Sequence, residues 1–453
     1  MIIPPKPPAR AERVPFWHFV RLFRKDVLSA LPARLYRARM AEFRTPFFTS
    51  YLVNEPPLWK HVLNECPQDF PKSDRMRAGL EPVMGESVFV SNGANWERQR
   101  RIIDPAFEGG RLRASFPAML EAARAAVDRM GQGGCIEVEE RMSHAAADVI
   151  FRALFSVPIG DAEASAVFRA FRAHQATQPL LNLAGFLPLP RWFPRFHRRA
   201  TLKTARRIRT LITTMTERRA AEIAAGTAPD DLATKIMTTP DPQTGQCFAT
   251  AEMVDQVATF FLAGHETSAT ALAWTLYLIA LDPDLQARLA DEADAVLGDA
   301  PAFGAVSRLR LARNVFREAL RLYPPLPMLV RQVARPARFR GRSVKPGAQV
   351  VVSPWHLGRN ERLWQDPDAF CPGRWQTAQG KASARDGFIP FSSGPRACSG
   401  AGFAMVEGPL MLAMLAQRFR FAPVAGRVPV PVAFLTVRAR DGIWLDVSPR
   451  GAA

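Results

Sequence analysis

The stretch Phe391-Ser392-Ser393-Gly394-Pro395-Arg396-Ala397-Cys398-Ser399-Gly400 holds one cysteine at the end of a loop rich in glycine and proline. A helical pattern follows directly, from about Ala401 to Gln417. Backbone N–H groups and the positive end of a helix stabilise a thiolate at such a position. Thiolates bind soft metal centres, so the loop predicts a metal-ligating Cys398 rather than a cysteine buried as a small apolar residue.

Five positions of this loop match the haem-binding signature of the cytochrome P450 family, the haem-thiolate monooxygenases: Phe391, Gly394, Arg396, Cys398 and Gly400. On these residues the chain resembles that family. The resemblance implies a fold that is mainly α with a small β subdomain, arranged as a triangular helical haem domain. It also implies haem b (iron protoporphyrin IX) as the cofactor. Cys398 would then be the axial ligand of the haem iron, with Phe391, Arg396 and Gly264 close to the haem.

The composition is that of a large globular protein with a basic surface. Of the 453 residues, 48% are hydrophobic and 23% are charged, which is enough for a sizeable core. The chain has 60 Lys and Arg residues and 42 Asp and Glu residues, which gives a formal net charge of +18. Nucleic acid, anionic membranes and acidic proteins are all attracted by such a surface. The arginines are scattered and no zinc-finger or leucine-zipper pattern occurs, so nucleic acid is the weakest of these alternatives.

Haem chemistry needs electrons, and the chain has no room for a flavin or iron–sulfur module beside the haem domain. The sequence therefore predicts a separate donor, an acidic ferredoxin or flavodoxin-type protein with its reductase. The arginines expected to contact that donor are Arg98, Arg101, Arg111, Arg113, Arg418 and Arg420.

The N-terminus and the cysteines indicate where the protein works. Residues 1–12 form a proline-rich tail without an apolar run long enough for a signal peptide or a membrane span. The five cysteines are widely spaced and include no CxxC pair, which fits a reducing cytoplasm better than a disulfide framework or a zinc site. Residues 13–43 mix aromatic and basic side chains and predict surface helices, with peripheral membrane contact as the alternative.

A single monomeric haem domain is expected over residues 13–450. Its β-rich parts are predicted at about 35–75 and 330–360, and an alternating stretch at 430–445 predicts a C-terminal hairpin.

Trp96 and Arg100 lie four positions apart near the start of a predicted helix and therefore share one face. A solvated basic face is the ordinary interpretation. In the resembled family a Trp-x-x-x-Arg pair contacts a haem propionate, a buried carboxylate that needs a cation. The resemblance implies that role here, with Arg331 and Arg396 as further propionate partners because guanidinium pairs well with carboxylate.

The longest helical pattern runs from Thr250 to Leu281, and its polar residues favour a buried central helix over a membrane span. Gly264 costs about 1 kcal/mol relative to alanine in a helix interior. It either lets a flat ligand or dioxygen approach, or it packs against another helix. Thr267 is expected to bond to the carbonyl of Ala263 and to open the helix locally.

The run from Ala263 to Thr267 resembles the family's acid–alcohol motif. The resemblance implies that Thr267 organises the hydrogen bonds needed for oxygen activation and that Glu266 relays protons from solvent. No role is assigned to His265. A peroxide-driven haem-thiolate enzyme or a non-catalytic haem-thiolate gas or redox sensor would not require this pair, so the motif favours reductive activation of O2.

Glu318 and Arg321 lie one helical turn apart, a spacing that is usually a surface ion pair worth only tenths of a kcal/mol. Residues 364–375 match the family segment that supplies a third member, Arg374. The resemblance therefore implies a buried network of Glu318, Arg321 and Arg374 that supports the cysteine loop.

The substrate is expected to be lipophilic, a fatty acid, terpenoid or carotenoid-like molecule that is hydroxylated. A leucine-rich, proline-broken stretch at 179–194 is either packed core or the lid over the substrate entrance, which is where the family places one. The apolar residues predicted to line the pocket are Val88, Phe89, Phe260, Ala263, Met328 and Val330.

Overall fold

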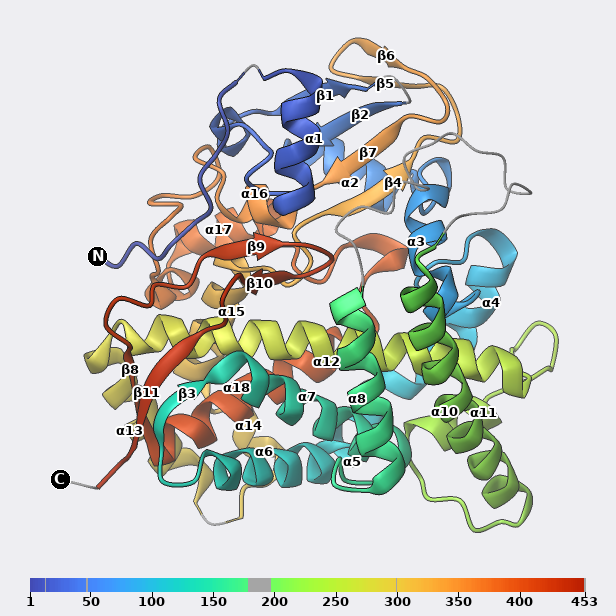
Figure 1. Ribbon diagram of the computed structural model, residues 1–453, viewed down its shortest axis with the longest axis vertical. Helices are drawn as coiled ribbons and strands as arrows, with labels where there is room; N and C mark the ends of the chain where they lie inside the picture. Colours follow the sequence, from blue (N-terminus) through green and yellow to red (C-terminus); the bar gives the residue numbers. More distant parts are fainter. Residues whose placement is uncertain (13, 46–47, 178–196, 299, 452–453) are drawn as a thin grey trace.

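Helix α12 (Thr250–Ala280) crosses the middle of the molecule, and the other long helices pack around it (Figure 1). This computed structural model describes residues 1–12, 14–45, 48–177, 197–298 and 300–451. The remaining helices before α12 are α1 (Phe16–Lys25), α2 (Pro56–Lys60), α3 (Asp74–Met84), α4 (Gly93–Ile103), α5 (Gly109–Ala114), α6 (Phe116–Met130), α7 (Val138–Phe155), α8 (Ala162–Thr177), α10 (Arg199–Ala224) and α11 (Leu232–Thr238). Those after it are α13 (Pro283–Leu297), α14 (Phe303–Val306), α15 (Arg310–Leu322), α16 (Pro354–Gly358), α17 (Ala378–Gly387) and α18 (Ala401–Arg418).

The central position of α12 follows from its sequence. Its residues from 271 to 280 are all buried, because the helix is apolar on every side there. Its polar residues near the start are paired: Asp255 accepts a hydrogen bond from Arg209 at 2.7 Å, and Gln256 accepts one from the Val88 N–H at 3.0 Å. The expectation of a buried central helix over this range is confirmed.

The largest sheet joins the two β-rich regions predicted from the sequence. Its strand order is β1 (Met40–Arg44), β2 (Thr49–Val53), β7 (Gln349–Val352), β4 (Leu329–Gln332). Strands β2 and β7 pair in parallel, which brings residues 299 positions apart in the sequence, such as Ser50 and Gln349, side by side. A short hairpin, β5 (Ala337–Phe339) and β6 (Arg342–Val344), extends beyond it. Helices with small sheets confirm the predicted fold class.

The C-terminal segment differs from the expectation. Residues 430–445 were predicted as one hairpin, and the structure forms a shorter one from β9 (Pro431–Ala433) and β10 (Val437–Ala439). The chain then continues into β11 (Trp444–Pro449), which pairs with both β3 (Gly134–Glu137) and β8 (Phe419–Pro423). The alternation near residue 445 therefore belongs to a second sheet.

Two further expectations concern membranes. The predicted lid at 179–194 lies outside the described residues. In the part of the chain that the structure describes, no helix combines the length and apolarity needed to cross a membrane.

Candidate functional site

The cysteine loop passes close to the β-rich side of the molecule and is shaped by one glycine. Gly394 adopts φ +70°, and a Cβ placed on it would lie 2.1 Å from the carbonyl oxygen of Leu63, so only glycine fits. The Cys398 N–H donates to the Phe391 carbonyl at 2.9 Å and closes the loop. Cys398 is exposed and stands three residues before the start of α18.

The surroundings of Cys398 act on the pKa of its thiol in opposite directions. Although the side chain reaches solvent, surrounding protein atoms raise the pKa of the thiol by desolvation, and a hydrogen bond from the Gly400 N–H and the charge of Arg100 only partly oppose this. Desolvation thus has the larger effect on this pKa, and the stabilisation of a thiolate by the loop stays a prediction. A coordinating metal ion deprotonates a thiol outright, so Cys398 suits a site that is completed by its metal.

Three cations lie close together at the loop, and the charge of Glu97 only partly offsets the effects that lower the pKa of Arg396. Arg331 is only 2% exposed, and burial lowers its pKa to about 10. Burial, Arg331 and Arg100 lower the pKa of Arg396 to about 9. Burial, Arg331 and Arg396 lower the pKa of Lys72 well below its usual range.

Among the described residues, Lys72, Arg331 and Arg396 form no ion pair with a carboxylate. Buried charges are normally paired, so this cluster indicates a bound anion with more than one negative charge. The two propionates of a haem have that chemistry, and the residues present fit the group.

Trp96 and Arg100, both on α4, take different roles. The Arg396 guanidinium lies over the Trp96 ring at 4.1 Å from its centroid. Arg100 instead donates to the Ala397 carbonyl at 2.9 Å and to the Ser399 hydroxyl at 2.8 Å. Arg100 also pairs with Asp104 at 2.9 Å, so in this structure it contacts the cysteine loop, and its propionate role stays a prediction.

An accessible stripe interrupts the burial of α12. Phe260, Ala263, Gly264, Thr267 and Ser268 are half-buried, whereas the neighbouring positions 261, 262, 265, 266, 269 and 270 are buried. The spacing i, i+3, i+4, i+7, i+8 puts these five on one face, which indicates internal space along the middle of the helix. The six residues predicted to line the pocket are all half-buried as well: Val88, Phe89, Phe260, Ala263, Met328 and Val330.

Thr267 and Gly264 show how the helix is built at this stripe. The Thr267 hydroxyl donates to the Ala263 carbonyl at 2.5 Å, as its position four residues later predicts. A Cβ on Gly264 would lie 2.6 Å from Cδ1 of Ile150 on α7. This contact supports close helix packing as a reason for Gly264, and its place near the haem stays a prediction.

Glu266 faces a different set of residues from Thr267. Its carboxylate accepts hydrogen bonds from the Thr436 hydroxyl at 2.6 Å and the Gln175 amide at 3.0 Å, and it pairs with Arg438. These partners come from α8 and from the C-terminal hairpin region. Its neighbour His265 is buried against Ser143, and burial lowers the pKa of that imidazole to about 4, which keeps it neutral.

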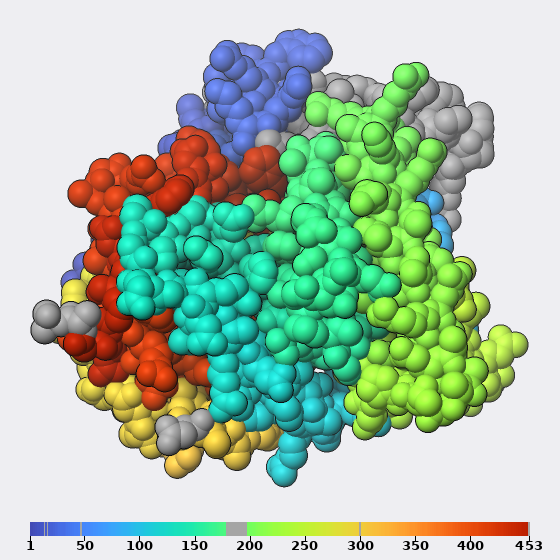
Figure 2. Space-filling view, turned by 60° about the horizontal axis from the view of Figure 1, so that its bottom comes forward, coloured from blue at the N-terminus to red at the C-terminus, as the bar shows by residue number. Residues whose placement is uncertain are grey.

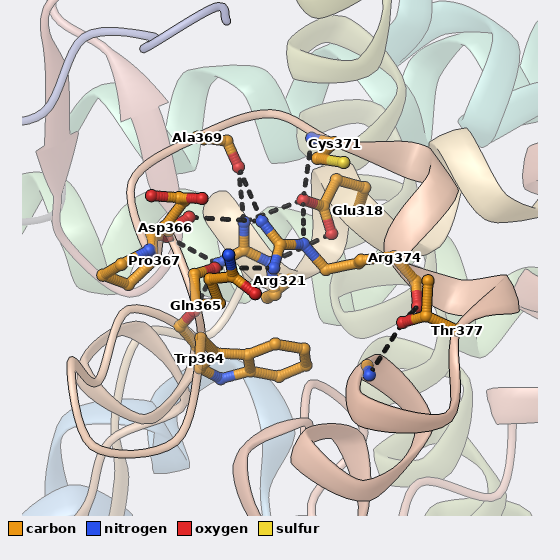
Figure 3. Close-up of polar contacts among 12 residues, drawn as sticks. Glu318, Arg321, Trp364, Gln365, Asp366, Pro367, Ala369, Cys371, Arg374 and Thr377 are labelled. Carbon is orange, nitrogen blue, oxygen red and sulfur yellow. Dashed lines mark hydrogen bonds and ion pairs between the residues drawn. The ribbon is translucent and has the colours of Figure 1, made fainter.

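The predicted network of Glu318, Arg321 and Arg374 is assembled in the structure, as Figure 3 shows. Arg321 and Glu318 form a two-point ion pair with contacts of 2.8 and 3.0 Å, and both side chains are fully buried. Arg374 reaches the same carboxylate at 2.9 Å, and the Cys371 N–H donates to it at 3.0 Å. The network thus joins α15 to the segment that leads toward the cysteine loop.

Several arginines expected to meet an electron donor are already paired within the chain. Arg98 contacts Glu252 at 2.7 Å and Arg101 contacts Asp241 at 2.6 Å. Arg111 pairs with Asp230. Local carboxylates therefore compete with a donor for these three charges, and contact of these arginines with a donor stays a prediction. The remaining candidates are exposed and form no ion pair among the described residues: Arg113, Arg418 and Arg420.

Three residues of the site escaped the sequence-based prediction. Lys72 belongs to the cation cluster but carries no signal in its own neighbourhood. Arg438 pairs with Glu266 from a strand more than 170 positions later. Glu407 on α18 accepts a hydrogen bond from Ser268 at 2.9 Å, and burial raises its pKa to about 8, so it is a neutral acid linking the cysteine helix to α12. An acid in an otherwise apolar helix was the signal for Glu407.

The comparisons with known proteins agree with this geometry. Residues 41–439 match the family Cytochrome P450. Cyclooctat-9-en-7-ol 5-monooxygenase from Streptomyces melanosporofaciens is 31% identical over 417 residues, covering 90% of this chain and 88% of the relative. Cyclooctatin synthase from the same organism is 32% identical, with 90% and 88% covered. Human cytochrome P450 4A11 is 29% identical, with 83% and 75% covered.

The solved haem domain of cytochrome P450DA has the same fold, with a TM-score of 0.82, 24% identity and 99% of both chains covered. The family match spans most of the chain and includes the cysteine loop, α12 and the buried scaffold. The chain therefore belongs to the cytochrome P450 family of monooxygenases, whose cofactor is haem b.

Proposed function

We propose that this enzyme hydroxylates a lipophilic substrate, using O2 and electrons from a separate redox protein. The observation that carries the proposal is the joint presence of Cys398 before α18, the unbalanced cation cluster and the accessible stripe on α12. When bound, the thiolate-ligated haem supplies the activation of O2 and the oxidation of a C–H bond.

In this proposal each residue has a defined task. Cys398 ligates the iron, and Lys72, Arg331 and Arg396 hold the propionates. Arg100 and Trp96 keep the cysteine loop and Arg396 in position. The scaffold network fixes the approach to that loop.

Proton supply is assigned to α12. Thr267 holds a hydrogen-bonding hydroxyl at the accessible stripe, and Glu266 relays protons from solvent. Because Glu266 is bound by Arg438, Gln175 and Thr436, proton transfer requires exchange of these hydrogen bonds with water.

The exposed arginines and the apolar residues of the predicted pocket indicate the electron donor and the substrate class. Arg113, Arg418 and Arg420 are the exposed cations left for an acidic ferredoxin or flavodoxin-type donor. The apolar lining supports a terpenoid, fatty acid or carotenoid-like substrate. The name of one relative describes a monooxygenase of cyclooctat-9-en-7-ol, which makes cyclic terpenoid-like molecules the first class to test. We place the enzyme in the cytoplasm, which its free cysteines support, and we propose that it is a monomer.

The proposal is tested with the purified protein. The reduced enzyme with CO is expected to give the spectrum typical of thiolate ligation, and a histidine-type spectrum would refute the assignment of Cys398. A library of terpenoids and fatty acids is then screened for low-to-high-spin shifts, followed by product analysis with each type of electron donor.

Thr267→Ala is expected to leave haem content unchanged while product formed per reducing equivalent falls about 10- to 100-fold and peroxide rises, because the hydroxyl that organises proton delivery is lost. Coupling is measured as product and peroxide against NAD(P)H consumed. Thr275→Ala is the matched control, since Thr275 makes the same bond to Ala271, at 2.6 Å, two turns further along the helix. Equal coupling in both variants would remove Thr267 from the mechanism.

Arg331→Leu is expected to speed haem loss by about 10- to 100-fold, because a charged hydrogen bond contributes roughly 1.5–3 kcal/mol. The same change relieves repulsion among the three cations, so the haem-free protein becomes more resistant to urea. Haem transfer to a scavenging apoprotein measures the first effect. Arg338→Leu, at an exposed position on β5, should match the wild type in both measurements. An unchanged rate of haem loss in Arg331→Leu would rule out the propionate role.

A further inference from the structure

A polar cavity of about 330 Å³ lies between α7, α8, α12 and the C-terminal hairpin. Its rim carries Glu140 and Arg172, which are exposed and lie 3.4 Å apart. Its floor is made of buried residues, Ser143, His265 and Glu266. Figure 2 shows the face on which the C-terminal strands (red) lie beside α7 (teal). The cavity therefore leads from the surface to the acid of α12.

Arg438 interacts with two of the acids that line this cavity. It pairs with Glu266 and also lies close enough to Glu139 to favour the ionised form of that carboxyl group. Glu137 is occupied elsewhere, because its carboxylate accepts the backbone N–H groups of Glu139, Glu140 and Ile443. Glu139 and Glu266 are thus two acids that share one arginine within the cavity.

Glu139 is the cavity acid suited to exchange protons near neutral pH. Its pKa is raised to about 7, mainly by burial and with smaller contributions from Glu137 and Glu266, while Arg438 and the Ala439 N–H oppose the shift. His265 does not compete, because it stays neutral with a pKa of about 4. Transfer is most efficient when the carrier's pKa is close to the working pH.

We propose that Glu139 collects protons from solvent and passes them through the cavity to Glu266, which is paired with Arg438. The inference rests on the proposed role of Glu266 in proton supply. A proton moves from bulk water to the Glu139 carboxylate, then through cavity water to Glu266, and Glu139 returns to its ionised form. Glu139 touches neither substrate nor O2, so it is a positioning residue that acts through Glu266.

The test uses Glu139→Gln in the haem-loaded enzyme across pH 6 to 9, a range that brackets the pKa of about 7. The wild type is expected to lose coupling as pH rises through 7, because protonated Glu139 becomes scarce. In the variant that inflection disappears, coupling is several-fold lower at pH 6, and the kinetic solvent isotope effect grows. Glu139→Asp should restore the inflection. Glu217→Gln changes an exposed acid on α10, outside the cavity lining, and should behave as the wild type.

A second readout does not depend on turnover. Infrared spectra recorded during a pH titration should contain a protonated-carboxyl band with a midpoint near pH 7 that is absent from Glu139→Gln. A wild-type pH profile in the variant, or a loss of coupling that is equal at every pH, would overturn the proposal. If the CO spectrum of the wild-type protein shows no thiolate ligation, the proposed function is refuted. The infrared band would still show whether Glu139 titrates near pH 7.

Discussion

Cys398→Ser is expected to abolish the thiolate-type CO spectrum and to lower monooxygenase activity by far more than the roughly 10- to 100-fold that loss of an outer-shell partner costs a metal site. Thiolate donation to the iron favours O–O cleavage, and a neutral serine hydroxyl does not supply it. The substitution removes little volume and keeps the loop closed, because the hydrogen bond to Phe391 comes from the backbone. Spectra, haem content and turnover are measured on the same preparation.

The matched control is Cys135→Ser, since Cys135 is an exposed free cysteine on β3, remote in sequence from the loop. Its spectrum and turnover should equal those of the wild type. A thiolate spectrum that survives in Cys398→Ser would mean that another residue ligates the iron, and the assignment of the whole loop would fail with it.

The parts of the site that the sequence predicts well are those with local geometry. The Thr267 hydroxyl reaches a carbonyl four residues away, and Glu318 and Arg321 are one turn apart on α15. Arg374 joined them only through the resemblance, because nothing local brings it to Glu318. A motif that specifies both the residue types and their spacing leaves few possible side-chain contacts, so those contacts can be predicted.

The parts that the sequence cannot predict depend on contacts between distant segments. Gly264 is explained by Ile150 of α7, and no pattern near Gly264 indicates that neighbour. The environment of Lys72 is set by Arg331 and Arg396, which lie more than 250 positions later. The local sequence around Arg98 likewise does not indicate its partner Glu252, which lies 154 positions later.

Arg321→Ala is expected to lower the free energy of unfolding by about 3–5 kcal/mol, the usual result of removing one partner of a buried ion pair. Arg321 donates to Glu318 and to the carbonyls of Gly358, Pro367 and Ala369. Its removal therefore leaves several buried acceptors without a hydrogen-bond donor. Denaturant titration measures the stability, and haem content reports whether the cysteine loop keeps its position.

Two further variants separate charge from geometry. Arg310→Ala removes an exposed arginine from the same helix and should change stability by less than about 0.5 kcal/mol. Arg321→Lys keeps the positive charge but not the planar fork that contacts Glu318 and the three carbonyls at once. If geometry determines the stability, Arg321→Lys should lie close to Arg321→Ala. Recovery to wild-type stability by lysine would mean that Glu318 needs only a neutralising charge, and that the shape of the network does not hold the loop.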